Sequence, residues 1–168
     1  MRLLLILILL SPSMALAQSE LITGAATTRE VYEKVTEAAA FLSKNGESGL
    51  SEFQNPKGRF VWKNTYVEVT KCADNICLPT HKSTDIGLNL LRLKCYVSGK
   101  FYIIDLCTEA MHKPKGAWIE YWYPRAGFDK PQRRVGFMMP AAGTDYQAAA
   151  GVWDDSTTLE ELNKLSNP

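Results

Sequence analysis

The sequence has few of the residues and motifs that mark metalloenzymes, hydrolases and nucleic-acid-binding proteins. It contains two histidines, His81 and His112, in 168 residues, which disfavours a histidine-based metal site. No Gly-x-Ser-x-Gly or His-Glu-x-x-His motif occurs, so no hydrolase or zinc-protease site is indicated. Lysine and arginine number 19 against 18 acidic residues, and this balance offers nucleic acid no basic excess. We therefore expect no enzymatic activity, no cofactor, no metal and no nucleic-acid partner.

Long hydrophobic runs are also missing, and the apolar run at the N-terminus spans only Leu3–Leu10. A helix of that length reaches far less than the roughly 30 Å of a bilayer core, which disfavours the alternative of a membrane anchor. Arg2 precedes the run, and Ala15 and Ala17 supply small residues before Gln18, which is the order of a secretory signal peptide. We expect cleavage near Ala17–Gln18 to leave one periplasmic or secreted domain over residues 18–168.

Cysteine is scarce, with four residues at Cys72, Cys77, Cys95 and Cys107. An even number in an exported chain favours disulfides. Cys72 and Cys77 bracket the turn-prone sequence Ala-Asp-Asn-Ile, which predicts a disulfide between them across a hairpin, and Cys95 then pairs with Cys107 by elimination. The alternative is a metal or redox site, but the spacing matches no zinc pattern and no Cys-x-x-Cys occurs.

The first part of the exported chain predicts a long helix. Thr27 and Glu30 have the spacing of a capping box, and Asn45-Gly46 predicts the end of the helix. Between them, apolar residues recur at helical spacing and would form one buried face, at Val31, Val35, Ala38 and Leu42. We also expect a shorter helix over 48–53 and a turn over 55–58.

The remainder predicts strands with one crossing helix. The β-rich segments are 66–70, with a short return at 78–80, and 118–123, 135–139 and 146–153. Helices are expected over 101–111 and at the C-terminus, where Ser156 or Thr157 would be the cap and Glu160 follows Thr157 at capping-box spacing. A long helix followed by a mostly antiparallel sheet is an α+β arrangement.

Five segments together resemble a known family, the single Cache domain. They are Asn55–Trp62, Tyr66–Val69, Ile86–Leu91, Gly116–Pro124 and Asp145–Trp153, and their order and spacing match over about residues 30–155. The resemblance implies a PAS-like fold, in which a long N-terminal helix packs on a central antiparallel sheet with a pocket on one sheet face. It also implies an extracytoplasmic sensor, of the kind found on chemoreceptors and histidine kinases, whose ligands are commonly small carboxylates or amino acids.

The sequence departs from the family pattern in two places. The family often has a His-Pro pair shortly before the Ile-Gly, whereas this chain has Leu78-Pro79-Thr80-His81, so the proline remains and the histidine is displaced. No hydrophobic run or signalling module follows residue 155. We therefore expect the domain to depend on a membrane-bound partner for signalling.

The candidate ligand contacts come from the sheet. Arg134 stands where the family often has a lysine, and its guanidinium suits a carboxylate; Tyr121 stands at the recurring tyrosine of the family. Strand periodicity places Trp118, Glu120 and Trp122 on one face and Ile119, Tyr121 and Tyr123 on the other. The candidate ligand-binding residues are Arg134, Tyr121, Tyr66, Tyr102, Trp118 and His81.

Structural alternatives exist for several of these residues. Arg134 could be a solvated charge or an ion-pair partner, and Arg133, which faces the opposite way, competes for its role. Tyr121 and the tryptophans could be core residues.

Three functions therefore compete. The first is a binding module that captures a small organic solute and presents it to a membrane-bound receptor or kinase. The second is a structural or interaction subunit with a filled pocket, for which the N-terminal helix is a natural homodimer face. The third is a thiol or hydrolytic enzyme, for which the motifs give little support.

Overall fold

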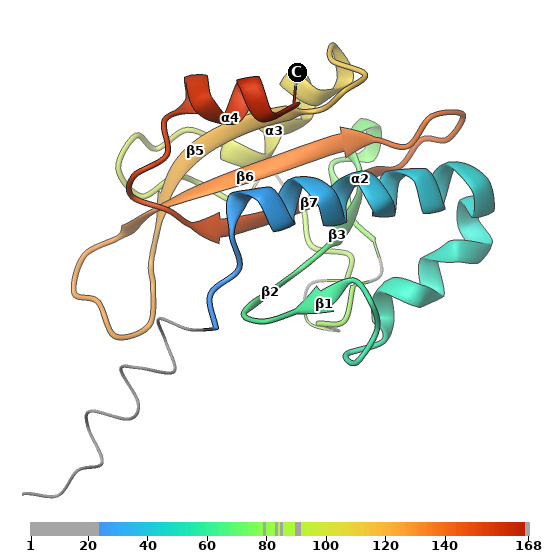
Figure 1. The fold of residues 1–168 in the computed structure, drawn as a ribbon, viewed down its shortest axis with the longest axis horizontal. Helices are drawn as coiled ribbons and strands as arrows, with labels where there is room; N and C mark the ends of the chain where they lie inside the picture. The colour runs from blue at the N-terminus through green and yellow to red at the C-terminus, as the bar shows by residue number, and fades with distance from the viewer. Residues whose placement is uncertain (1–23, 79, 83, 85, 90–91, 167–168) are drawn as a thin grey trace, which may run out of the picture.

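The computed structural model describes residues 24–78, 80–82, 84, 86–89 and 92–166, so the expected signal peptide, residues 1–17, lies outside the described residues. None of the described helices is long and apolar enough to cross a bilayer. The elements follow one another as α2 (Thr28–Asn45), the 3-10 helix η1 (Gly46–Gln54), β1 (Val61–Trp62), β2 (Thr65–Tyr66), β3 (Glu68–Lys71), the 3-10 helix η2 (Cys72–Asp74), β4 (Ile76–Cys77), α3 (Tyr102–Met111), β5 (Ala117–Tyr123), β6 (Gln132–Pro140), β7 (Gln147–Trp153) and α4 (Leu159–Ser166) (Figure 1).

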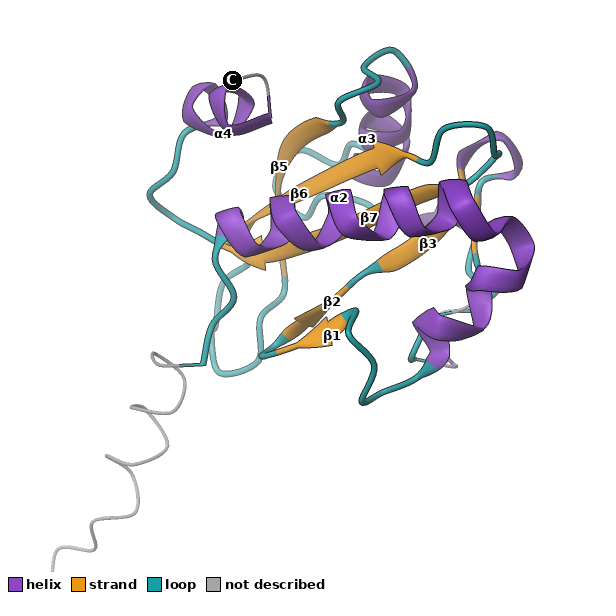
Figure 2. Cartoon of the chain, turned by 45° about the vertical axis from the view of Figure 1, so that its right-hand side comes forward, coloured by secondary structure: helices purple, strands orange, loops and turns teal. Residues whose placement is uncertain are grey.

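The centre of the fold is a five-stranded sheet in the order β4-β3-β7-β6-β5, in which all neighbouring strands are antiparallel. β1 and β2 form a separate two-stranded hairpin. Helix α2 runs across one face of the sheet and α3 lies against the other (Figure 2). Because each strand alternates its side chains between the two faces, this arrangement gives one apolar core under α2 and another under α3.

Helix α2 forms for the reasons that its sequence predicts. The Thr27 hydroxyl accepts the Glu30 amide at 3.2 Å, and the Glu30 carboxylate accepts the Thr27 amide at 2.8 Å, so the capping box is present. Its apolar residues form a single buried face against the sheet: Val31, Val35, Ala38, Ala39 and Leu42. The predicted helix is confirmed, and burial of this face anchors it to β6 and β7.

Several element boundaries differ from the prediction. The strand expected over 66–70 is two strands, β2 and β3, and only β3 joins the main sheet. Its return strand is β4, Ile76–Cys77, instead of 78–80. The last helix is capped by Thr158 with Glu161, one residue later than expected. The Asp154 carboxylate already accepts the amides of Ser156 and Thr157, which holds these two residues in the turn before the helix.

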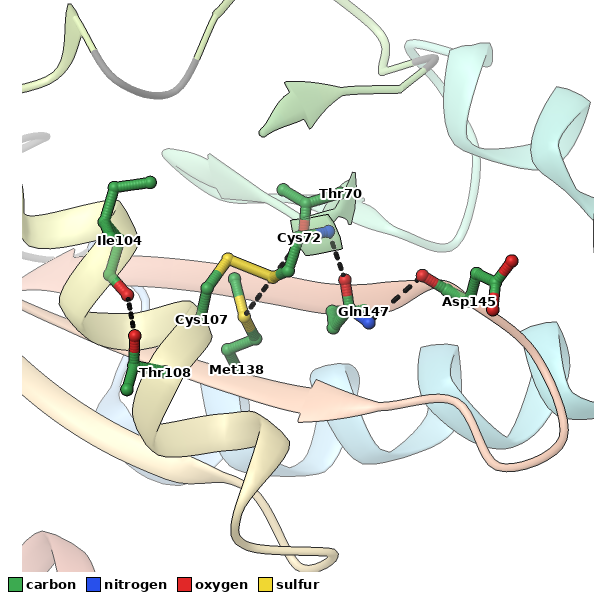
Figure 3. Close-up of a disulfide and its surroundings, with 8 residues drawn as sticks. All are labelled: Thr70, Cys72, Ile104, Cys107, Thr108, Met138, Asp145 and Gln147. Atoms are coloured by element: carbon green, nitrogen blue, oxygen red, sulfur yellow. Dashed lines mark hydrogen bonds between the residues drawn. A yellow bond between two sulfur atoms is a disulfide. The ribbon is translucent and has the colours of Figure 1, made fainter. Parts of the chain in front are cut away.

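The predicted disulfide pairing is wrong, because Cys72 is bonded to Cys107 (Figure 3). The register explains the error: Cys77 lies opposite Thr70 in the β3–β4 hairpin, so it does not face Cys72. Cys72 begins η2, where its amide donates to the Gln147 side chain at 2.8 Å and its sulfur meets α3. Cys77 is not bonded to Cys72, and Cys95 is not bonded to Cys107; both are buried thiols.

Candidate ligand-binding site

The alternation of side chains along β5 and β6 separates the two faces as predicted. On the α3 face, Tyr121 lies directly opposite Arg134 in the β5–β6 pairing. On the α2 face, Trp118 lies opposite Phe137, and their rings contact each other with centroids 4.7 Å apart. Arg134 and Tyr121 are therefore brought together on the face that carries α3.

A cavity of about 260 Å³ lies between this face and α3. Small residues of β6 and β7 line it, among them Gly136, Ala149 and Gly151, and Gly136 and Gly151 are direct cross-strand partners. The apolar lining includes Leu88, Leu93, Ile103 and Leu106. The polar lining consists of Tyr66, Glu68, Lys82, Tyr102, Tyr121, Tyr123 and Arg134. An open cavity of this kind favours ligand binding over a subunit with a filled pocket.

Gly151 makes room for the two polar groups that meet in the cavity. A Cβ atom at this position would lie 3.1 Å from Nε of Arg134 and 3.3 Å from the hydroxyl oxygen of Tyr121. Nη2 of Arg134 also donates to the Gly151 carbonyl at 3.0 Å. The guanidinium and the phenol therefore share the space above Gly151.

Arg134 has unused hydrogen-bonding capacity. Its Nε is buried without a hydrogen-bond partner, and it forms no ion pair with any of the residues that the structure describes. Its CZ lies 5.4 Å from the centre of the Trp153 ring, a cation–π contact. Burial opposes its charge, but the neighbouring Tyr121 and the Glu68 carboxylate raise the pKa of Arg134, so the guanidinium stays charged.

Arg133, the competing arginine, is engaged elsewhere. Its guanidinium is 2.8 Å from the Glu120 carboxylate, and its Nη1 donates to the Asp154 carbonyl at 2.7 Å. It does not line the cavity. Two adjacent arginines on one strand thus have different surroundings, because they point to opposite faces of the sheet.

Tyrosines form much of the cavity wall. The rings of Tyr102, from α3, and Tyr121, from β5, are stacked with centroids 3.8 Å apart. Burial raises the pKa of both tyrosines, so their phenols are neutral hydrogen-bond donors at physiological pH. Tyr66 lines another part of the wall, where Nζ of Lys82 is 4.8 Å from its ring centre.

Two of the predicted contacts are not in the cavity lining. Trp118 is 4% exposed and belongs to the core under α2, since its position on β5 directs it away from Tyr121. Trp118 instead lines a second hollow at β5, and its contact with a ligand stays a prediction. His81 packs edge-on against the Tyr66 ring, with centroids 4.1 Å apart, so it supports the wall without lining the cavity.

Two charged residues of the cavity lining, Glu68 and Lys82, were not predicted from the sequence. Glu68 follows buried Val67 and precedes buried Val69, so its alternation with these valines was a signal that it faces away from the α2 core. Lys82 comes from the segment after β4, where no periodic pattern indicated its position.

A second hollow, of about 520 Å³, runs along the outer edge of β5 and is more open than the cavity. Cys95 lines it, and its sulfur accepts the Trp122 amide at 3.3 Å and the Ser98 amide at 3.5 Å. Burial alone would raise the pKa of the Cys95 thiol, but hydrogen bonds from Ser98, Trp122 and Val97 lower it to about 7. We place the candidate site in the smaller cavity because it is better enclosed and contains Arg134.

No protein-family model matches the chain, and no curated protein matches it. Solved structures do match. A periplasmic sensor domain of a chemotaxis protein gives a TM-score of 0.52 at 13% identity and covers 86% of this chain and 100% of that chain. A Cache chemosensory domain described for carboxylic acid recognition gives 0.54 at 14%, covering 85% and 97%. The chain has the fold of a Cache sensor domain.

A third match supports the Cache fold. A methyl-accepting chemotaxis protein from Vibrio parahaemolyticus gives a TM-score of 0.57 at 16% identity, covering 85% of this chain and 97% of that chain. The predicted α+β, PAS-like Cache architecture is therefore confirmed, including the long helix on an antiparallel sheet. At this level of identity the likeness establishes the Cache fold, and the ligand has to be argued from the cavity.

Proposed function

We propose that this protein is an extracytoplasmic, non-enzymatic binding domain that captures a small organic carboxylate or amino acid. The observation that carries the proposal is the state of Arg134. Its guanidinium is partly buried and lines an open cavity. The Nε atom has no hydrogen-bond partner, and the group makes no ion pair with a described residue. A carboxylate would supply both the negative charge and the paired acceptors that this group lacks.

Tyr121, Tyr102 and Tyr66 complete the proposed site. The Tyr121 hydroxyl shares the space above Gly151 with the guanidinium, so it can donate to the same carboxylate. The structural neighbour described for carboxylic acid recognition makes this ligand class a natural one for the Cache fold. The likeness of the fold to chemotaxis sensor domains supports a membrane-bound receptor or kinase as the partner.

The homodimer through α2 stays a prediction. The apolar face of α2 is buried on the sheet, so a dimer would have to form through its outer face, which carries Arg29, Glu33 and Lys44. The expected periplasmic or secreted location likewise rests on the signal-peptide pattern in residues 1–17.

The adjacent arginines offer a matched test. Isothermal titration calorimetry and thermal shift should be measured with a panel of small organic acids and amino acids, on the wild type, Arg134→Ala and Arg133→Ala. We expect Arg134→Ala to weaken the best ligand by about 100-fold, because it removes a buried charged donor. Arg133→Ala should change affinity less than about threefold, since Arg133 faces away from the cavity. Absence of binding across the panel, or equal effects of the two substitutions, contradicts the proposed site.

A further inference from the structure

The segment that leads into α3 is basic. Residues 92–101, which we call the basic turn, contain Arg92, Lys94 and Lys100 and no acidic residue. All three cations are exposed, and none forms an ion pair with a residue that the structure describes. The turn therefore presents positive charge that the described part of the protein does not neutralise by direct contact.

The same turn exposes apolar side chains. Tyr96 is 62% exposed, Val97 68% and Phe101 37%, and these are three of the six large apolar side chains that lie exposed among the described residues. Nζ of Lys94 is 4.8 Å from the centre of the Phe101 ring, so cationic and aromatic groups share one surface. Exposed apolar side chains gathered in one place mark an interaction surface more often than scattered ones do.

The backbone of the basic turn is largely satisfied within the protein. The Cys95 amide donates to the Lys100 carbonyl and the Gly99 amide to the Cys95 carbonyl, both at 2.8 Å, and the Tyr96 amide donates to the Trp122 carbonyl at 2.9 Å. The amides of the turn that donate within the protein are those of Cys95, Tyr96, Ser98, Gly99 and Lys100. Such a turn can leave water at low cost, because unsatisfied amides are the main penalty for placing a loop in a bilayer.

The basic turn is also held firmly against the sheet. The sulfur of Cys95 accepts the Trp122 amide at 3.3 Å, and the Tyr96 ring packs edge-on against Tyr123 of β5, with centroids 5.4 Å apart. Because these contacts fix the turn before any partner arrives, little conformational entropy remains to be lost on binding.

The acidic groups beside the turn are mostly paired. The hollow along β5 is lined by Asp105, Glu109 and Glu120. Glu109 forms an ion pair with Lys113 at 2.7 Å, and Glu120 forms one with Arg133 at 2.8 Å. The positive charge of the basic turn therefore dominates this part of the surface, and it complements an anionic partner.

We propose that the basic turn docks the protein on a lipid bilayer that contains anionic phospholipid. Tyr96 and Val97 would lie at the level of the headgroups, where aromatic and apolar side chains gain from partial burial. Lys94 and Lys100 would meet the lipid phosphates, with their aliphatic stems against the apolar region. Leu93, at the start of the turn, lines the cavity, so docking would hold the cavity close to the membrane. This surface is separate from solute capture and does not depend on it.

Vesicle sedimentation tests the proposal. The exported protein should be used, with removal of the N-terminal run confirmed by intact mass, since Leu3–Leu10 could bind vesicles by itself. We expect binding to equimolar phosphatidylcholine and phosphatidylglycerol vesicles, at least 10-fold weaker binding to pure phosphatidylcholine, and loss of binding as salt increases. Lys94→Gln/Lys100→Gln should weaken binding about 25-fold, because each cation near an anionic surface contributes about fivefold.

The apolar contribution has its own variants. Val97→Ser should weaken vesicle binding about fivefold, and Val97→Trp should strengthen it, because tryptophan favours the bilayer interface. Met111→Ser is the matched control, since Met111 is 60% exposed but lies at the other end of α3. Lys113→Gln/Lys115→Gln, at that same end, removes two charges from outside the basic turn. Neither control should change binding more than about twofold.

Several results would overturn the proposal. They are the absence of binding to the mixed vesicles, equal binding to both kinds of vesicle, and losses in the two controls as large as those in the basic turn. Sedimentation velocity covers a further case: a dimer that Val97→Ser dissociates would assign the surface to a second copy of the chain. Thermal melts establish that each variant is folded, and calorimetry with small acids judges the proposed function independently.

Discussion

The two faces of the central sheet use the same strands for opposite purposes. Under α2, β5 to β7 contribute apolar side chains, most of them large, to one buried core: Trp118, Val135, Phe137, Ala148 and Val152. Under α3, the same strands contribute a mixture of very small and polar residues: Tyr121, Arg134, Gly136, Ala149 and Gly151. The first face is a closed core, and the second contains a cavity.

The helices are attached to their faces in different ways. α2 is held by its buried apolar side chains, whereas α3 is also linked to the end of β3 by the disulfide from Cys72 to Cys107. A cavity beneath a helix removes some of the van der Waals contacts that would otherwise hold the helix on the sheet. A covalent bond keeps α3 in place over a surface that is only partly filled.

The largest effect should come from the closed face. Phe137 is fully buried, and it contacts Tyr32 and Trp118, with ring centroids 5.4 and 4.7 Å away. We expect Phe137→Ala to lower the free energy of unfolding by about 4 kcal/mol, because it leaves a void in a packed core. Urea titration followed by circular dichroism measures the change. A loss below about 1 kcal/mol would mean that the α2 face is not the main source of stability.

The disulfide should have the next largest effect. The double variant Cys72→Ala/Cys107→Ala should be less stable by about 3 kcal/mol, since the bond closes a loop with a sequence separation of 35. Urea titration with and without dithiothreitol is the measurement, and only the wild type should respond to the reductant.

Thiol counting provides the control for this pairing. Denatured, unreduced protein should show two titratable thiols, at Cys77 and Cys95. A peptide map that links Cys72 to Cys77 would refute the pairing and with it the tether of α3.

A smaller effect is expected from filling the open face. Gly151→Ala would place a Cβ 3.1 Å from Nε of Arg134 and 3.0 Å from the Val135 carbonyl, so the guanidinium must move. We expect a loss of ligand affinity of at least 10-fold, measured by calorimetry. Gly136→Ala is the matched control, because its Cβ would meet its nearest neighbours at 3.5 Å or more. Similar losses for both variants would show that cavity volume, instead of the position of Arg134, controls binding.

The smallest effect concerns Cys95, which lines the hollow at the outer edge of β5. Because the pKa of Cys95 is lowered to about 7, its reactive thiolate fraction should rise steeply between pH 6 and pH 8. In a Cys77→Ala background, the iodoacetamide reaction rate should therefore be half-maximal near pH 7. Ser98→Ala removes a hydroxyl donor and should shift that midpoint upward. A midpoint at the ordinary value of about 8.5 in the starting protein contradicts the hydrogen-bonded thiolate.

Local patterns were enough to predict much of the fold. The capping box and apolar spacing of α2, the strands from β5 to β7 and the separation of Trp118 from Tyr121 by strand periodicity all follow from neighbouring residues. The prediction that Arg134 and Tyr121 lie together also depended on the resemblance to Cache domains. It succeeded because the two residues are direct partners in an antiparallel pairing.

Contacts between segments far apart in the chain could not be predicted from local patterns. Cys107 reaches Cys72 only because α3 crosses the sheet beside the end of β3, and no local spacing records that crossing. The position of Glu68 in the lining of the same cavity as Arg134 depends on β7 lying between β3 and β6, which is a property of strand order. The position of the Arg134 guanidinium and the Tyr121 hydroxyl above Gly151 likewise depends on how β5, β6 and β7 lie side by side.

The sequence by itself determined most of the elements and the alternation of their faces, because those depend on interactions between near neighbours in the chain. Only the tertiary structure decided which cysteines join, which arginine enters the cavity and which acidic group lines it as well. These outcomes depend on distances between segments far apart in sequence, and folding establishes those distances through the packing of α2 and α3 on opposite faces of one sheet.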